Sequence, residues 1–176
     1  TCEVFFTNVP ILASALIREE GRGFRHISDG MNAERCLTAA EAIGSGRYFV
    51  EKAVNYANER TVFNRPIGQN QGIQFPIAQG HAQLEAADLM VRKACAMFDA
   101  GLPCGGEANM ARLLAAEASW QCAEACFSTH GGFAFAREYD IERKWRETRL
   151  SRTAPISTNL ILGYVGQHIR GMPKSY

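Results

Sequence analysis

The sequence predicts an all-α domain, an antiparallel up-and-down bundle of the four-helix type, preceded by a short strand segment that belongs to a neighbouring β-domain. Long stretches rich in Ala, Glu, Arg and Leu carry small or apolar residues at helical spacing. Short segments rich in glycine and proline separate these stretches. A stretch rich in Val and Phe opens the chain and has the composition of a strand. At 176 residues, the chain is long enough to bury one core.

The first half of the chain contains the strand segment and two long helices. The strand EVFFTNV is followed by the loop EEGRGF, and the first helix is predicted from Ser28 to Asn58, a stretch without proline. The segment NRPIGQNQG interrupts it. Residues at helical spacing from Ile73 to Phe98 then predict a second helix, in which Pro76 marks either the first turn or a kink.

The second half predicts one long helix and two shorter ones. After the turn AGLPCGG, a third helix is predicted from Glu107 to Thr129, ended by paired glycines. Three residues are expected on its inner face: Leu113, Leu114 and Cys122. A charged helix follows over residues 140–150. Pro155 is expected to begin the last helix, because proline tolerates the first helical turn, and Gly171 and Pro173 are expected to end it.

Composition favours some classes of protein over others. Nineteen basic and 18 acidic residues leave a net charge of +1, so no overall field favours nucleic acid or an anionic membrane. No apolar run approaches the roughly 20 residues that span a bilayer. Six dispersed cysteines favour a reducing compartment, which predicts a cytoplasmic protein or one of the mitochondrial matrix. Cys122 and Cys126 share a helix face, but no histidine pair accompanies them, so we assign no metal.

Residues 58–75, NERTVFNRPIGQNQGIQF, contain the densest cluster of groups that could bind a ligand. Arg60 and Arg65 flank Phe63, and the amides of Gln69, Asn70 and Gln71 follow. Guanidinium groups pair with phosphate oxygens, and an aromatic ring can lie against a flat ligand. The alternative is a solvated helix end, at which arginine complements the helix dipole.

A second candidate segment, STHGGFAF, places Gly131 and Gly132 directly after a helix. Glycines at this position let the backbone approach a ligand closely, or they simply cap the helix. We interpret His130 as a hydrogen-bonded structural residue rather than a base, because no nucleophile lies near it in the sequence.

Seven segments in this order resemble the C-terminal helical domain of the acyl-CoA dehydrogenases: EVFFTNV, EEGRGF, GMNAER, YANERTVFNRPIGQNQGIQF, EANMARLLAAEA, THGGFAF and ERKWRETRL. The resemblance implies that residues 1–24 are the end of a middle β-domain with its linker, and that residues 25–176 are the C-terminal bundle. It also implies an FAD cofactor, an acyl-CoA substrate that is oxidised to the 2-enoyl-CoA, and an electron-transfer flavoprotein as electron acceptor. The expected assembly is a homodimer or homotetramer.

The resemblance assigns roles to residues at both candidate segments. Arg60 and Phe63 would contact the flavin cofactor of a neighbouring subunit, with Gln71 beside them. Three further contacts are implied: Gly131 and Gly132 would approach the adenine-side half of the cofactor, whereas Ser157 and Asn159 would lie near the flavin ring.

The segment TAPISTN contains no acid, although many relatives carry their catalytic glutamate there. In register, Pro155 replaces that glutamate, and it also lacks the N–H that the family uses to hold the thioester carbonyl. The isovaleryl and long-chain branches place the base on the first long helix instead, in a Glu-Arg pair that matches Glu34 and Arg35. The resemblance therefore implies that Glu34 is the base and that Arg35 orients it or the substrate. Partial burial between Met31 and Leu37 would suit Glu34 to take a proton near neutrality.

Two other functions remain open from the sequence. The lost acid at position 155 favours a non-catalytic module that binds flavin or only assembles subunits. An oxygen-using oxidase or monooxygenase relative would keep the same fold and flavin.

Overall fold

The computed structural model describes residues 2–175, with side chains for all of these except residue 29. The chain divides into two compact units, Thr1–Met31 and Asn32–Tyr176. The first unit contains a single-turn helix, η1 (Ala13–Ala15), and the beginning of helix α1 (Gly23–Glu59).

The N-terminal segment expected to be a strand is not one in this structure. Residues 2–10 form no β-bridge, and Val4, Phe5 and Phe6 are 68%, 84% and 81% exposed. A strand becomes stable only when a neighbouring backbone completes its hydrogen-bond ladder. The described residues of this unit offer no such neighbour, so the Val- and Phe-rich composition does not produce a strand here.

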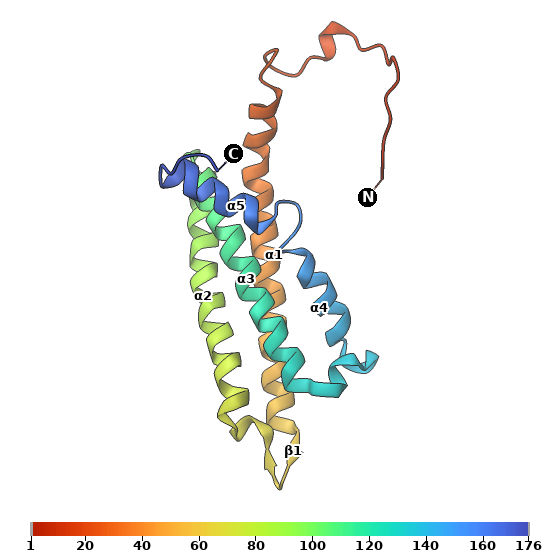
Figure 1. The fold of residues 1–176 in the computed structure, drawn as a ribbon, viewed down its shortest axis with the longest axis vertical. Coiled ribbons are helices and arrows are strands. Elements are labelled where there is room, and N and C mark those ends of the chain that lie inside the picture. The colour runs from red at the N-terminus through yellow and green to blue at the C-terminus, as the bar shows by residue number, and fades with distance from the viewer. Residues whose placement is uncertain (1, 176) are drawn as a thin grey trace. The chain divides into compact units, whose positions relative to one another are not determined.

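The second unit is the predicted up-and-down bundle, and the all-α fold class is confirmed. From Asn32 onward, α1 lies alongside α2 (Gln71–Asp99) and α3 (Gly105–His130), with successive helices running in opposite directions (Figure 1). The shorter helix α4 (Ile141–Leu150) packs against α3. Helix α5 (Thr158–Tyr164) continues into the π-helical turn η5 (Val165–Ile169). It crosses the end of the bundle that lies opposite the connection between α1 and α2 (Figure 1).

The core is built mainly from small side chains, which let the long helices approach closely. Its larger members include Phe49 of α1, Leu84 of α2 and Ile141 of α4, and all three are fully buried. Between them α3 contributes a series of buried alanines and the thiols of Cys122 and Cys126. Leu114 differs from the expectation, since it is 44% exposed. Alanines at the neighbouring positions already fill the inner face of α3, which leaves Leu114 on the outer side.

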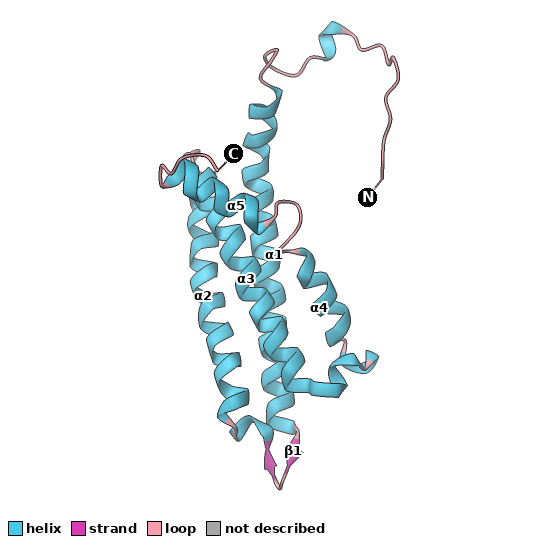
Figure 2. Cartoon of the chain, viewed as in Figure 1, coloured by secondary structure: helices cyan, strands magenta, loops and turns pink. Residues whose placement is uncertain are grey.

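The connection between α1 and α2 is a two-stranded hairpin, which Figure 2 shows at one end of the bundle. Strand β1 (Thr61–Val62) pairs with the antiparallel strand β2 (Arg65–Pro66), and η2 (Ile67–Gln69) leads into α2. Pro76 lies inside α2, in its second turn. Two short helices, η3 (Gly131–Phe135) and η4 (Arg137–Tyr139), join α3 to α4.

The last helix does not begin at Pro155 as predicted. Ser157 is its N-cap, and the Ser157 hydroxyl oxygen accepts a hydrogen bond from the Leu160 N–H at 3.4 Å. Pro155 lies in the preceding loop, after a cis peptide bond. The serine satisfies a backbone donor that proline cannot, which explains why the N-cap lies two residues after the proline and the helix begins at Thr158. Among residues 2–175, no helix has the length and apolar character needed to cross a membrane.

Candidate functional site

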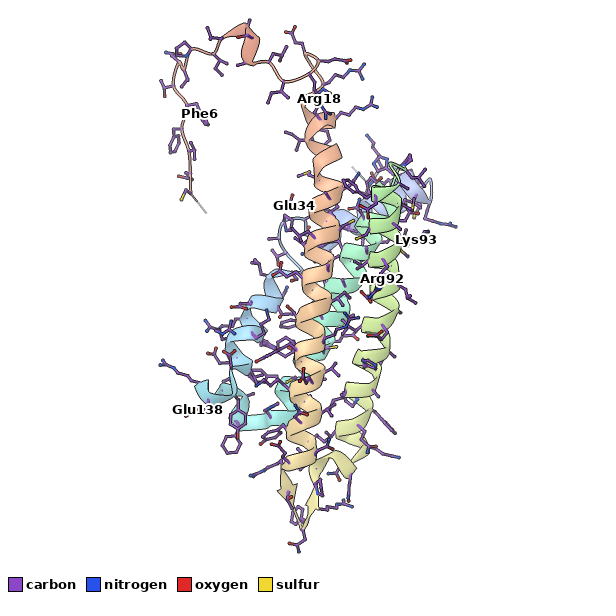
Figure 3. The ribbon with its side chains drawn as sticks, turned by 180° about the vertical axis from the view of Figure 1, so that it is seen from behind. Phe6, Arg18, Glu34, Arg92, Lys93 and Glu138 are labelled. Carbon is purple, nitrogen blue, oxygen red and sulfur yellow. The ribbon has the colours of Figure 1, made fainter. Side chains whose placement is uncertain are left out.

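The residues expected to bind cofactor or substrate lie at the two opposite ends of the bundle. The hairpin end carries the larger group: Arg60, Phe63, Gln71, Gly131 and Gly132. The other end carries Glu34, Arg35, Ser157 and Asn159, and Figure 3 shows Glu34 on the half of α1 that is remote from the hairpin. One small ligand therefore cannot touch both groups within a single copy of this chain.

At the hairpin end, a cavity of about 460 Å³ brings Arg60 together with both glycines. Arg60 directly follows α1, and the glycines directly follow α3, so the fold joins residues that are 71 positions apart in the sequence, Arg60 and Gly131. The other lining residues are Tyr56, Val62, Ile67, Thr129, His130 and Phe133. The guanidinium carbon of Arg60 lies 5.7 Å from the ring centre of Phe133, which orients the positive charge beside an aromatic face.

The glycine pair leaves one wall of this cavity open. Gly131 has a φ of +57°, a conformation that favours glycine, and a Cβ added at either glycine would meet no neighbouring atom within 4 Å. A ligand can therefore approach the backbone of both residues directly. The paired glycines act as more than a helix stop, because they shape the wall opposite Arg60.

His130 supports the glycine turn from inside, as predicted for a structural residue. Its Nδ1–H donates to the Cys126 carbonyl oxygen at 2.8 Å, because a carbonyl can only accept. Its ring is stacked on Tyr56, with 4.2 Å between the ring centres. Burial lowers the pKa of His130, which favours the neutral imidazole.

Two of the expected contacts do not line this cavity. Phe63 is at the tip of the hairpin, 94% exposed, with a φ of +51°. Gln71 is the first residue of α2 and is also exposed. Nearby, Arg65 donates to the Asn70 side-chain oxygen at 3.1 Å, so its guanidinium fastens the hairpin to the residue that precedes α2.

The donor set of the cavity fits a dinucleotide cofactor with a pyrophosphate. Within the described part of the chain, Arg60 forms no ion pair, and its charge lies beside the aromatic ring of Phe133 in the cavity lining. An unpaired guanidinium can take phosphate oxygens without first giving up a carboxylate. Flat rings and open glycine backbone suit the heterocyclic part of such a ligand.

At the opposite end, Glu34 points to solvent. It is exposed, and Leu37, one turn further along α1, is 70% exposed. The partial burial expected for Glu34 is therefore absent within this chain, because the described residues provide nothing that covers this face of α1. Arg35 faces inward instead. One of its terminal nitrogens donates to the Asn32 side-chain oxygen at 3.0 Å, and its Nε is buried.

The loop between α4 and α5 carries Pro155 and leads to the other two expected contacts. Ser157 uses its hydroxyl to cap α5, and Asn159 lies exposed in the first turn of that helix. The loop is fastened to α3 by Arg112, whose guanidinium donates to the carbonyl oxygens of Ser151 and Ala154. Sequence reasoning missed Arg112, because an isolated arginine in an alanine-rich helix has the pattern of a surface residue.

Sequence reasoning also did not single out Tyr56 and Phe133 at the hairpin end. Each sits within four residues of a predicted contact, so helical spacing from Arg60 and proximity to the glycines were the available signals. Across residues 2–175, with residue 29 left aside, no group of three or more His, Cys, Asp or Glu side chains is arranged to hold a metal ion.

Comparison with known proteins gives one family model, which is described as the C-terminal domain of acyl-CoA dehydrogenase and matches residues 21–159. The chain is 39% identical over 176 residues to the acyl-CoA dehydrogenase fadE12 of Mycobacterium bovis, and the match covers 99% of this chain and 45% of that protein. The chain thus spans about half the length of the curated relatives that it matches.

Solved structures with the same fold include two ligand complexes. A glutaryl-coenzyme A dehydrogenase in complex with glutaryl-CoA superposes with a TM-score of 0.89 at 30% identity, over 97% of this chain and 44% of that one. PigA with FAD and proline superposes with a TM-score of 0.89 at 25% identity, over 94% of this chain and 43% of the other.

Proposed function

Because this chain belongs to the acyl-CoA dehydrogenase family, with residues 21–159 matching the C-terminal domain, we propose that the whole protein is an FAD-dependent acyl-CoA dehydrogenase. Its substrate is an acyl-CoA thioester, which it oxidises at the Cα–Cβ bond to the 2-enoyl-CoA. Residues 1–24 are the end of a middle β-domain with its linker, and residues 25–176 are the C-terminal bundle. The cavity that joins Arg60 to the open glycine turn is the observation that carries the flavin part of this proposal.

Glu34 is the base that removes the α-proton. The thioester α-proton is weakly acidic, so a carboxylate must be held within about 3 Å of it while the carbonyl is stabilised. Glu34 is exposed and forms no ion pair within the described part of the chain, so its carboxylate is free to receive a proton. Pro155, at the position where many relatives carry the glutamate, has no group that could. Bound flavin supplies the acceptor for the β-hydrogen and its electron pair.

Arg35 supports this site from inside the bundle rather than through Glu34. Its hydrogen bond to Asn32, the residue at which the second unit begins, holds the guanidinium against α1. From there it orients the substrate or the backbone that carries the base. Ser157 and Asn159 stand at the same end and line the flavin ring side of the site.

The separation of the two ends supports a homodimer or homotetramer. Arg60 and Phe63 contact one flavin cofactor, with Gln71 beside them, and Gly131 and Gly132 approach its adenine-side half. The end with Glu34 serves a different cofactor. The cofactor held at the hairpin end then belongs to a neighbouring subunit. An electron-transfer flavoprotein takes the electrons onward, and the enzyme works in the cytoplasm or the mitochondrial matrix.

Anaerobic mixing of the whole flavoprotein with straight-chain and branched acyl-CoA thioesters tests the proposed function. We expect at least one thioester to bleach the flavin absorbance, since the hydride reduces the cofactor. Reduction by dithionite is the control that shows a competent flavin. A protein that dithionite reduces and that no thioester in the panel reduces would refute the assignment as a dehydrogenase.

The missing acid at position 155 favours one rival function, a flavin-binding or assembly module without catalysis. That rival predicts no bleaching by any thioester, with flavin bound if the module binds it and absent if the module only assembles subunits. An oxidase relative would instead turn over in air without an electron-transfer flavoprotein, so aerobic consumption of oxygen with an acyl-CoA distinguishes it from both.

A further inference from the structure

Arg112 is the one fully buried arginine among the residues that the structure describes, and it contacts the loop that follows α4. It is 2% exposed and lies in the second turn of α3. Burial lowers the pKa of Arg112, and the attraction of the Glu41 charge opposes this effect. A guanidinium stays charged in proteins, so a buried one needs strong acceptors. Its Nε and Nη1 have no hydrogen-bond partner in the described part of the chain.

All the hydrogen bonds of this guanidinium go to one loop. Its Nη2 donates to the Ser151 carbonyl oxygen and, at 2.7 Å, to the Ala154 carbonyl oxygen. Both carbonyls follow the C-terminus of α4, where a positive charge is favourable. An apolar side chain of similar size would fill the same space without losing hydration. The arginine therefore contributes the two carbonyl contacts rather than core packing.

Backbone hydrogen bonds within the loop also hold it together. The Thr158 N–H donates to the Arg152 carbonyl oxygen at 3.3 Å, and the Thr153 and Ala154 N–H groups both donate to the Leu150 carbonyl oxygen. A second side chain from α3 adds to the anchoring, since the Nε of Arg152 donates to Glu117 at 2.8 Å. Pro155 and Ile156 take part in none of these bonds, and Pro155 is exposed.

We propose that Arg112 is a positioning residue that sets where residues 154–157 lie in the active site. The peptide group between Ala154 and Pro155 is planar, so fixing the Ala154 carbonyl oxygen also fixes the plane from which Pro155 and the following residues continue. The consequence for the reaction rests on the proposed function, which places this loop beside the thioester and the flavin. Arg112 itself touches neither, because it lies beneath the loop.

Three variants of the whole flavoprotein test this role. Arg112→Met removes the donors and keeps much of the volume, while Arg112→Lys keeps the charge and offers a compact ammonium. Arg146→Met is the matched control. It removes an arginine from α4 that is bonded to Glu142 on the outer surface.

The first measurement is hydrogen–deuterium exchange of peptides that cover residues 151–161. We expect Arg112→Met to speed exchange there by about tenfold or more, because local opening then costs less free energy. Arg112→Lys should fall between Arg112→Met and the wild type, and Arg146→Met should match the wild type. Exchange in this segment at the wild-type rate in Arg112→Met would overturn the proposal. So would exchange that rises equally along all of α3 and α4 in both Arg112 variants, since that indicates a general loss of stability.

The second measurement is anaerobic flavin reduction by the best acyl-CoA of the panel. We expect the limiting rate of Arg112→Met to fall by up to about 10²-fold, as misplacement near a reacting centre can cost, with FAD content unchanged. Arg112→Lys should recover part of the rate. Faster loop exchange with a wild-type limiting rate would mean that the loop is held by Arg112 without serving the reaction, and would overturn the role. If Arg112→Met does not fold, Arg112→Lys decides both measurements.

Failure of the proposed function stays distinguishable from failure of this inference. A wild-type protein that no acyl-CoA reduces removes the proposed reaction and, with it, the role of Arg112 in that reaction. The exchange measurement still decides whether Arg112 holds the loop, because it needs no substrate.

Discussion

At the scale of single residues, the fold separates groups that the sequence places side by side. Glu34 and Arg35 are consecutive on α1, yet the carboxylate faces solvent and the guanidinium bonds to Asn32 within the bundle. Residues far apart in the sequence, such as Arg60 and Gly131, meet instead around one cavity. Side-chain direction on a helix, more than sequence proximity, decides which groups can act together.

The proposed base is tested by Glu34→Gln in the whole flavoprotein. Glutamine keeps the shape and can hydrogen-bond, but it cannot take the α-proton. Acyl-CoA binding should survive, while anaerobic flavin reduction slows by about 10²–10⁴-fold, as the loss of a general base typically does. Glu51→Gln, at another exposed position on α1, is the control and should reduce at the wild-type rate. Flavin bleaching as fast as wild type in Glu34→Gln would show that the base lies elsewhere.

Arg60→Ala tests the proposed flavin contact at the hairpin end. A charge-assisted hydrogen bond to phosphate contributes about 1.5–3 kcal/mol, so the variant should bind FAD more weakly by that amount. The measurement is equilibrium binding of FAD to the whole apoprotein. Arg65→Ala is a close control, because Arg65 belongs to the same hairpin but bonds to Asn70 and does not line the cavity. Equal FAD affinity in both variants would remove Arg60 from the site.

Burial of His130 predicts a dependence of stability on pH. Because burial lowers the pKa of His130 below the 6.5 of an exposed imidazole, the unfolded chain takes up a proton more readily than the folded one. The His130 contribution is therefore complete above about pH 6.5 and is lost as the pH falls below it. Urea unfolding between about pH 7.5 and about pH 5.5 should show a smaller loss of stability in His130→Gln than in the wild type. His81→Gln, at an exposed position, should retain the wild-type slope; an equal slope in all three would contradict the prediction.

At the scale of elements, close packing between α1 and α2 depends on particular small residues. A Cβ added at Gly46 would lie 2.5 Å from the Leu84 Cδ1 atom, and Leu84 is 0% exposed. Such an atom cannot be accommodated without moving a core side chain of the facing helix. Glycine is otherwise unfavourable within a helix, so its presence in the middle of α1 follows from this contact.

Two substitutions on the same helix should change stability in opposite directions. Gly46→Ala should lower the free energy of unfolding by about 1–3 kcal/mol through overpacking. Gly44 is exposed and has no neighbouring atom within 4 Å of an added Cβ, so Gly44→Ala should raise the free energy by up to about 1 kcal/mol through helix propensity. Chemical denaturation of both variants measures the difference. A Gly46→Ala protein as stable as Gly44→Ala would show that Leu84 moves aside without cost.

At the scale of the whole molecule, the bundle has its own core but presents many apolar side chains to solvent. Leu37, Phe75 and Leu89 are 70%, 59% and 70% exposed, and they lie on the outer faces of α1 and α2. Exposed apolar area on this scale is typical of surfaces that other domains or subunits cover. It agrees with a chain that spans 45% of the length of its relative.

We expect the 176-residue chain to fold as a helical protein that neither retains FAD nor oxidises acyl-CoA. The core lies within the bundle, whereas the proposed function has Arg60 and Glu34 serve different cofactors, each of which also contacts surfaces outside this chain. Circular dichroism should show a cooperative helical transition, and the purified chain should lack flavin absorbance. Stoichiometric yellow flavin that copurifies with the chain would contradict this prediction.

Local pattern was sufficient for the helical part of the fold. Alanine-rich stretches, turn segments and helical spacing predicted the long helices and their order, since these signals arise within a few turns of one chain. Two predictions were wrong for local reasons. Ser157, and not Pro155, begins α5 as its N-cap, and residues 2–10 lack the partner that would make them a strand. In both cases a specific hydrogen-bond partner, rather than composition, determined the outcome.

By itself, the sequence determined the family, the bundle and the types of group available at each candidate segment. The tertiary structure alone decided that Arg60 faces Gly131 and Gly132 across one cavity, that Glu34 lies at the opposite end, and that Arg112 reaches beneath the loop at Pro155. The reason is physical: periodicity within a helix reports which residues share a face, but the partner of that face is chosen by close packing between segments distant in the chain.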